Sequence, residues 1–207
     1  MKPRINILLI LALAINLNSC QDEDDVAQLE PAPLTCETAN TTFSTIYNDI
    51  LINENLNSYD HVDSPLHAYV FSVSSEKQLC SIGYQSFHED ASVPFDIIIR
   101  EDATGTIIYS ESLLFMQNNM SYASLTPHVV LQPDTDYVLS RIQNDYGTRL
   151  NNVIGNVIDG STNTGTVNFL PYTDYGFTIL STRFYNFNDE EVDVLNFLPQ
   201  INLVFAE

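Results

Sequence analysis

The sequence predicts an all-β domain: an antiparallel β-sandwich of jelly-roll or immunoglobulin-like kind, with about ten strands. Residues typical of strands are abundant, because the 207-residue chain holds 11 Tyr and 11 Phe besides many Val, Ile and Thr. Short runs alternate large apolar residues with smaller or polar ones, and few segments keep a helical period. Turn residues separate these runs at intervals of roughly 8–12 residues, which is the spacing expected of a sandwich.

The run 67–73 shows the strand alternation most clearly. Residues 94–100 and 106–110 form a predicted hairpin, in which Gly105 stands where the turn needs a positive φ. The predicted strands are residues 67–73, 79–87, 94–100, 106–110, 120–125, 128–131, 137–142, 153–158, 166–170, 176–185 and 201–205.

Residues 40–52 are the ambiguous segment of the folded region. Phe43, Ile46 and Ile50 recur there at loosely helical spacing, so a helix and a strand both stay open. The rest of the folded region favours strands.

Residues 1–19 have the form of a secretory leader. Lys2 and Arg4 make a cationic head, and residues 5–17 are nearly all Ile, Leu and Ala. As a helix rising ~1.5 Å per residue, this apolar stretch would reach only about 20 Å, too short for a ~30 Å hydrocarbon core. The segment therefore predicts a signal peptide that is removed from the mature protein.

The residues around the end of the leader, Leu17-Asn18-Ser19-Cys20, resemble the bacterial lipobox. That resemblance implies cleavage before Cys20 and acylation of the Cys20 thiol. Several acyl chains, each adding about 0.8 kcal/mol per buried CH₂, anchor a protein far more durably than one chain. The alternative is an ordinary signal peptide in which Cys20 plays no part.

Residues 20–34 are predicted to be a tether, because they are acidic, contain Pro31 and Pro33, and show no apolar period. The four acids Asp22–Asp25 resemble the export signal of Bacteroidetes-type surface lipoproteins. That resemblance implies a protein on the outer face of the outer membrane. A lipoprotein that faces the periplasm is the alternative.

Residues 35–207 are predicted to form a single domain, since no second linker, repeat or low-complexity block interrupts them. A chain of that length buries about 70% of its unfolded surface. The formal charge of the full chain is −20, and loss of the leader with its two cations makes it −22. Such a body repels phosphate backbones, which excludes nucleic acid as a partner.

Two cysteines remain once Cys20 is assigned to the lipid. Cys36 and Cys80 form an even pair in an oxidising compartment, which predicts a disulfide closing a loop of 43 residues. A bridge over such a loop contributes typically ~2–4 kcal/mol. Two buried thiols that never meet are the alternative.

The stretch 131–139, Leu-Gln-Pro-Asp-Thr-Asp-Tyr-Val-Leu, resembles the tyrosine corner of immunoglobulin-like and fibronectin-type sandwiches. The resemblance implies that Tyr137 starts a strand and that its hydroxyl group bonds back to the backbone. Tyr137 is therefore assigned a structural role.

Three features together resemble the small β-sandwich modules of unknown function on surface lipoproteins of polysaccharide-using bacteria. They are the strand Phe71–Val73 followed by residues 80–86, the hairpin with its Gly turn, and the tyrosine corner. Such modules share the architecture of carbohydrate-binding jelly rolls, and this likeness implies a fold but no particular ligand.

Motifs for catalysis are not found in the sequence. The four histidines, His61, His67, His88 and His128, lack zincin spacing, and no Gly-x-Ser-x-Gly elbow, phosphate loop or dinucleotide fingerprint occurs. His61 and His88 have acidic neighbours but are predicted to be solvated loop residues. We therefore predict no enzyme activity, no metal site and no cofactor.

Two alternatives to that prediction stay open. A pair of carboxylates for glycoside hydrolysis could lie among the 27 acids, although the sequence gives no spacing to test. A structural calcium ion could be held by Asp134 and Asp136 or by Asp22–Asp25, although neither group follows EF-hand spacing.

Sugar binding requires aromatic faces beside hydrogen-bonding side chains. The chain has no Trp, but several Tyr fall at strand ends or in loops. The candidate ligand rim is Tyr84, Tyr146, Arg149, Tyr172 and Tyr175. The structural alternative is that each Tyr packs its ring and leaves its hydroxyl group wet.

Together these observations predict a lipid-anchored outer-membrane protein, exposed at the cell surface, that acts as a non-enzymatic binding module. Its predicted partner is a glycan or another surface component, besides the membrane that its lipid enters. One alternative is a structural or assembly subunit of a surface protein complex. Another is a glycosidase or esterase whose site the sequence does not reveal.

Overall fold

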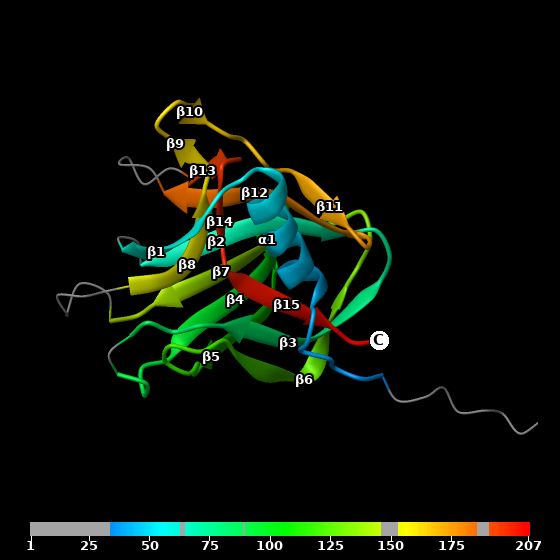
Figure 1. The fold of residues 1–207 in the computed structure, drawn as a ribbon. Coiled ribbons are helices and arrows are strands. Elements are labelled where there is room, and N and C mark those ends of the chain that lie inside the picture. Colours follow the sequence, from blue (N-terminus) through cyan, green and yellow to red (C-terminus); the bar gives the residue numbers. More distant parts are fainter. Residues whose placement is uncertain (1–33, 63–64, 89, 146–152, 186–190) are drawn as a thin grey trace, which may run out of the picture. The chain divides into compact units, whose positions relative to one another are not determined.

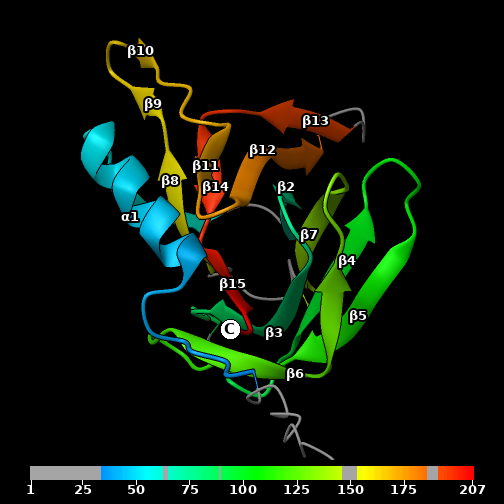
Figure 2. The same cartoon turned by 90° about the vertical axis from the view of Figure 1, so that its right-hand side faces the viewer.

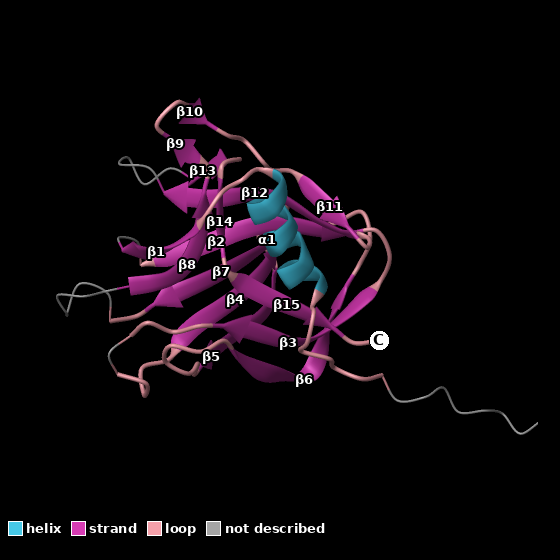
Figure 3. Ribbon diagram, viewed as in Figure 1, coloured by secondary structure: helices cyan, strands magenta, loops and turns pink. Residues whose placement is uncertain are grey.

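The structure is a computed structural model of the chain, and it describes residues 34–62, 65–88, 90–145, 153–185 and 191–207. The predicted leader, Cys20 and the part of the tether before Leu34 lie outside the described residues. Within the described part, every ladder between strands is antiparallel, and a single helix accompanies them (Figure 3). The prediction of an all-β antiparallel sandwich is confirmed.

The largest sheet has seven strands in the order β11-β12-β2-β7-β4-β5, with β13 paired to β12 (Figure 1). Antiparallel neighbours such as β4 and β5 are joined by short turns, whereas β2 and β7 come together from distant parts of the chain. The strands are β2 (Leu66–Val73), β4 (Phe95–Glu101), β5 (Ile107–Leu113), β7 (Asp136–Gln143), β11 (Tyr172–Asp174), β12 (Phe177–Tyr185) and β13 (Glu191–Val194).

Two three-stranded sheets and one short hairpin complete the domain. One sheet has the order β15-β3-β6, with β3 (Lys77–Tyr84), β6 (Ser121–Leu131) and β15 (Ile201–Phe205). The other has the order β1-β8-β14, with β1 (Ser58–Val62), β8 (Val153–Asp159) and β14 (Phe197–Pro199). The hairpin pairs β9 (Ser161–Thr162) with β10 (Gly165–Thr166).

The ambiguous segment 40–52 is a helix, α1 (Thr42–Asn53). Thr41 caps its first turn, since its Oγ1 accepts a hydrogen bond from the Ser44 backbone at 3.0 Å. One face of α1 is buried beside β15 and β11 (Figure 2). The buried residues recur at helical spacing, so the segment forms a helix and not a strand. Among the described residues, no helix is long and apolar enough to cross a membrane.

The core lies between the large sheet and the smaller ones. Side chains on one face of β2, β4, β7 and β12 meet those of β3 and β15, and α1 adds its buried face. The Tyr69 hydroxyl group donates to the Ile201 carbonyl at 2.8 Å, which joins the large sheet to β15. The ring of Phe71 lies 5.6 Å from those of both Tyr137 and Phe177.

Two local predictions are confirmed. Cys36 and Cys80 form a disulfide with Cα atoms 6.0 Å apart, which fastens the start of the domain to β3. The Tyr137 hydroxyl oxygen accepts a hydrogen bond from the Gln132 backbone at 2.9 Å, which is the tyrosine corner.

The predicted strand at 166–170 is wrong beyond its first residue. Phe169 and Leu170 are buried, but their backbone N–H groups both donate to the Leu195 carbonyl instead of forming a ladder. The predicted strands 120–125 and 128–131 are one strand, β6, whose pairing with β3 is irregular near its middle. Pro127 lies at this irregular position of an edge strand, where a missing N–H costs no ladder bond.

Candidate functional site

The turn between β11 and β12 presents an exposed aromatic ring. Asp174 pairs with Phe177, so the turn holds only two residues, Tyr175 with φ of 44° and Gly176 with φ of 72°. Two positive φ values define a type I′ turn, in which Asn-Gly is the favoured pair and Tyr is unfavourable. The Tyr175 side chain is 77% exposed, so neither burial nor backbone preference explains its presence there.

A surface hollow of about 530 Å³ adjoins this ring. Gly176 fixes the turn beside it, because its carbonyl accepts a hydrogen bond from the Ser74 backbone at 2.9 Å and a Cβ atom would meet Ser74 Oγ at 2.5 Å. The hollow is lined by Asn40, Thr42, Thr45, Lys77, Tyr175 and Glu207.

The lining of this hollow, which we call the Tyr175 hollow, carries both donors and acceptors of hydrogen bonds. It offers an amide, two hydroxyl groups, an ammonium group and a carboxylate around one aromatic face. The Lys77 ammonium lies 5.3 Å from the centre of the Phe205 ring, a cation–π contact that orients it. The charges of the Lys77 and Glu207 side chains cancel, so the lining side chains carry no net charge.

The sequence-predicted rim residues do not form one site. Tyr84 is 2% exposed and its ring packs 5.2 Å from that of Phe95, so its assignment to a surface rim is wrong. Tyr172 lies on β11, and its hydroxyl oxygen accepts from Asn53 at 3.3 Å, which ties that strand to α1. Tyr146 and Arg149 lie outside the described residues. Tyr175 is the rim residue that lines the hollow.

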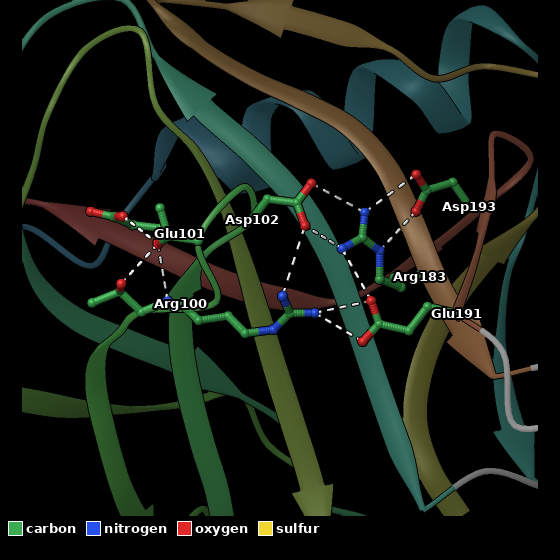
Figure 4. Close-up of polar contacts among 8 residues, drawn as sticks. Arg100, Glu101, Asp102, Arg183, Glu191 and Asp193 are labelled. Atoms are coloured by element: carbon green, nitrogen blue, oxygen red, sulfur yellow. Dashed lines mark hydrogen bonds and ion pairs between the residues drawn. The ribbon is translucent and has the colours of Figure 1, made fainter.

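A second feature, on the outer face of the large sheet, is a network of ion pairs (Figure 4). Arg183 leaves β12 and binds Asp193 through two oxygens, at 2.9 and 3.3 Å. Arg100 leaves β4 and binds both Glu191 oxygens, at 2.9 and 3.1 Å. Asp102, in the β4–β5 turn, contacts both guanidinium groups and is bound most closely by Arg183.

The network shifts the titration of its members. Hydrogen bonds from Arg183 hold the pKa of the Asp102 carboxyl group below its ordinary value. The same interaction, in which Asp102 accepts from Arg183, raises the pKa of Arg183 above its ordinary value. Both guanidinium groups are already paired with carboxylates, so the network is a connection between elements and not an open anion site.

Arg100, Arg183 and Glu191 of this network also line an apolar hollow of about 220 Å³ on the outer sheet face. Leu66, Ile98 and Ile142 line it, and Ile107 at its edge is 58% exposed. An apolar centre beside charged side chains is the composition found in protein–protein contacts.

Polar side chains also gather at the end of the sandwich where β7 ends. His88 Nε2 lies 2.9 Å from Asp145 Oδ2, and Gln143 donates to the other Asp145 oxygen at 3.2 Å. The prediction that His88 is a solvated loop residue is wrong, since it is 2% exposed. Its partner is 57 positions away, so no local pattern could have shown this pair.

The described residues contain no group of three or more His, Cys, Asp or Glu arranged to hold a metal ion. Asp134 and Asp136 accordingly lie near each other in the chain without forming such a group.

No protein-family model matches the sequence, and no curated protein matches it at a significant level.

Proposed function

We propose that this chain is a non-enzymatic glycan-binding module, held by lipid on Cys20 at the surface of the outer membrane, and that the Tyr175 hollow is its sugar site. The predicted leader and lipobox-like residues support the location, and the hollow supports the ligand class. A neutral sugar fits best, because the lining has no net charge.

The conformation of Tyr175 carries this proposal. A non-glycine residue with positive φ costs about 1–2 kcal/mol, and strained backbone of this kind clusters at functional sites. The Tyr175 ring, which is 77% exposed, offers a flat surface on which the C–H face of a sugar can stack. Asn40, Thr42 and Glu207 lie within reach of the same hollow to bond sugar hydroxyl groups.

The substitution Tyr175→Asn separates binding from folding. It removes the ring and supplies the residue that a type I′ turn prefers, so we expect stability to rise by about 1 kcal/mol, roughly 2–4 °C in Tm. On a glycan array and then by calorimetry with the retained sugar, we expect affinity to fall at least about tenfold, or about 1.4 kcal/mol.

The matched control is Tyr59→Asn, which removes an exposed ring (51%) that does not line the hollow. That variant should bind as the parent does. Equal binding by the Tyr175→Asn variant and the parent would refute the hollow as the site. An array that retains no sugar at all would refute the glycan proposal.

A second candidate is the assembly subunit of a surface complex, favoured by the apolar hollow on the outer sheet face. A face of this kind accepts an aliphatic side chain from another protein. Purification from outer membranes with one fixed partner, lost in an Ile98→Glu variant, would favour this function over sugar binding.

A further inference from the structure

The guanidinium group of Arg141 is buried in the core without an acceptor among the residues that the structure describes. Arg141 lies on the inner face of β7 and is 0% exposed. None of its three side-chain nitrogens has a hydrogen-bond partner among the described residues. Such groups are rare in native proteins, because a buried charge must be paired and its donors satisfied.

The residues paired with Arg141 in the two flanking ladders carry no negative charge. Its neighbours across the ladder are His67 on β2 and Ile97 on β4. The guanidinium carbon lies 5.0 Å from the centre of the Phe95 ring and 5.3 Å from that of Tyr84. Two ring faces stabilise a cation, but they accept none of its five N–H groups in a hydrogen bond.

A second polar atom without a partner lies beside it. The Tyr84 hydroxyl group is buried and has no hydrogen-bond partner within the described part of the chain. It packs against Gly155, where a Cβ atom would approach the hydroxyl oxygen to 2.7 Å. Burial raises the pKa of Tyr84 and the charge of Arg141 partly offsets that rise, so the two groups share one electrostatic environment.

We infer that Arg141, together with the Tyr84 hydroxyl group, binds a small monovalent anion inside the sandwich. One guanidinium group requires one negative charge, and the N–H groups of one guanidinium edge, together with the phenolic O–H, would donate to the ion. An enclosed site favours a small, weakly hydrated ion such as chloride, whose removal from water costs less than that of a multivalent anion. This site is separate from the Tyr175 hollow and does not depend on the proposed function.

Thermal unfolding in sodium chloride and sodium gluconate tests the inference. At equal sodium concentration, screening of the acidic surface is the same in both salts, so a difference reports the anion. We expect Tm of the full chain to be about 5 °C higher in about 0.5 M chloride than in gluconate. Equal Tm values in the two salts would overturn the site.

The Arg141→Met variant should lose this difference. Its Tm in gluconate should equal or exceed that of the parent, because an unpaired buried charge has been replaced by an apolar chain. Arg100→Met is the matched control, since Arg100 binds carboxylates on the outer face, and it should keep the full chloride effect. A chloride effect that survives Arg141→Met would place the ion elsewhere and refute the assignment.

Two measurements do not depend on the folding of that variant. Tyr84→Phe keeps the ring and removes the O–H donor, so it should shrink the chloride effect by at least about half. Crystals of the parent grown in sodium bromide should show an anomalous peak within contact distance of the Arg141 guanidinium group. Crystals with no peak there would contradict the inference.

Discussion

At the scale of single residues, two tyrosines differ in what their side chains contact. The Tyr137 ring is 2% exposed and its hydroxyl oxygen holds the backbone of Gln132, so both ends of the side chain serve the fold. Tyr175 packs against little and occupies an unfavourable backbone conformation. This unfavourable conformation supports the proposed role of Tyr175 in binding.

Removal of one hydroxyl group tests the tyrosine corner. Tyr137→Phe keeps the ring contact with Phe71 and leaves the Gln132 N–H group without its acceptor. We expect a loss of about 1 kcal/mol, seen as a fall of roughly 2–4 °C in Tm with an unchanged circular dichroism spectrum. Tyr59→Phe, at an exposed position, should melt with the parent, and an unchanged Tm for Tyr137→Phe would remove the energetic role of the corner.

At the scale of elements, two ion pairs on the outer sheet face, Arg183–Asp102 and Arg100–Glu191, connect segments that no ladder joins. Asp102 belongs to the β4–β5 turn, while Arg183 lies on β12, and β2 and β7 separate them in the sheet. Arg100 and Arg183 line the same hollow as Ala68 and Val138, which are 2% and 1% exposed on this outer face. The network therefore adjoins apolar surface as well as pairing charge.

The pKa of Asp102 predicts how this network responds to acid. The folded-state pKa is lowered, so ionised Asp102 contributes stability above its ordinary pKa of 3.8, and that contribution is lost as pH falls through the folded-state value. Asp102→Asn should lower Tm by about 2–4 °C at pH 7, corresponding to ~1 kcal/mol for a partly exposed network, and should change it little near pH 2.

The control is Asp49→Asn on α1, which should leave Tm unchanged at both pH values. High salt should reduce the Asp102→Asn effect at neutral pH, since the pairs are partly exposed. A constant difference between parent and variant across the whole pH range would show that lost packing, not charge, causes the effect.

At the scale of the whole molecule, the negative charge of the chain is consistent with the predicted tether. A chain of formal charge −20 is repelled by other acidic surfaces, which suits a domain held away from a membrane by a spacer. The lipid on Cys20 remains a prediction, because that residue lies outside the described part of the chain.

Substitution of the predicted lipid site tests the location. Cys20→Ala should leave the membrane pellet and appear in the soluble fraction, because no acyl chain can then enter the bilayer. Cys36→Ser is the matched control, since it removes a thiol from the disulfide and should stay with the membrane. If Cys20→Ala sediments with the envelope as the parent does, the anchoring proposal and the surface role that depends on it are refuted.

The parts of the fold that the sequence predicted are those encoded by local patterns. Alternation predicted the strands, the positive φ at Gly105 followed from a tight hairpin, and nine residues around Tyr137 were enough for the corner. The prediction of a strand at 166–170 was wrong because it rested on the apolar residues Phe169 and Leu170. These side chains are buried, but a buried side chain does not require its backbone to pair in a ladder.

The sequence by itself determined the fold class and the structural tyrosine, because periodicity and turn residues act within a short span. It predicted the disulfide from the cysteine count, and the structure decided that Cys36 and Cys80 meet. Only the tertiary structure decided that His88 is buried, that Tyr84 lies in the core, and that Arg141 faces two aromatic rings. It also assembled the Tyr175 hollow from segments more than 160 positions apart, between Asn40 and Glu207. Strand alternation states which face a side chain takes, but only the order and packing of the strands decide what that face meets.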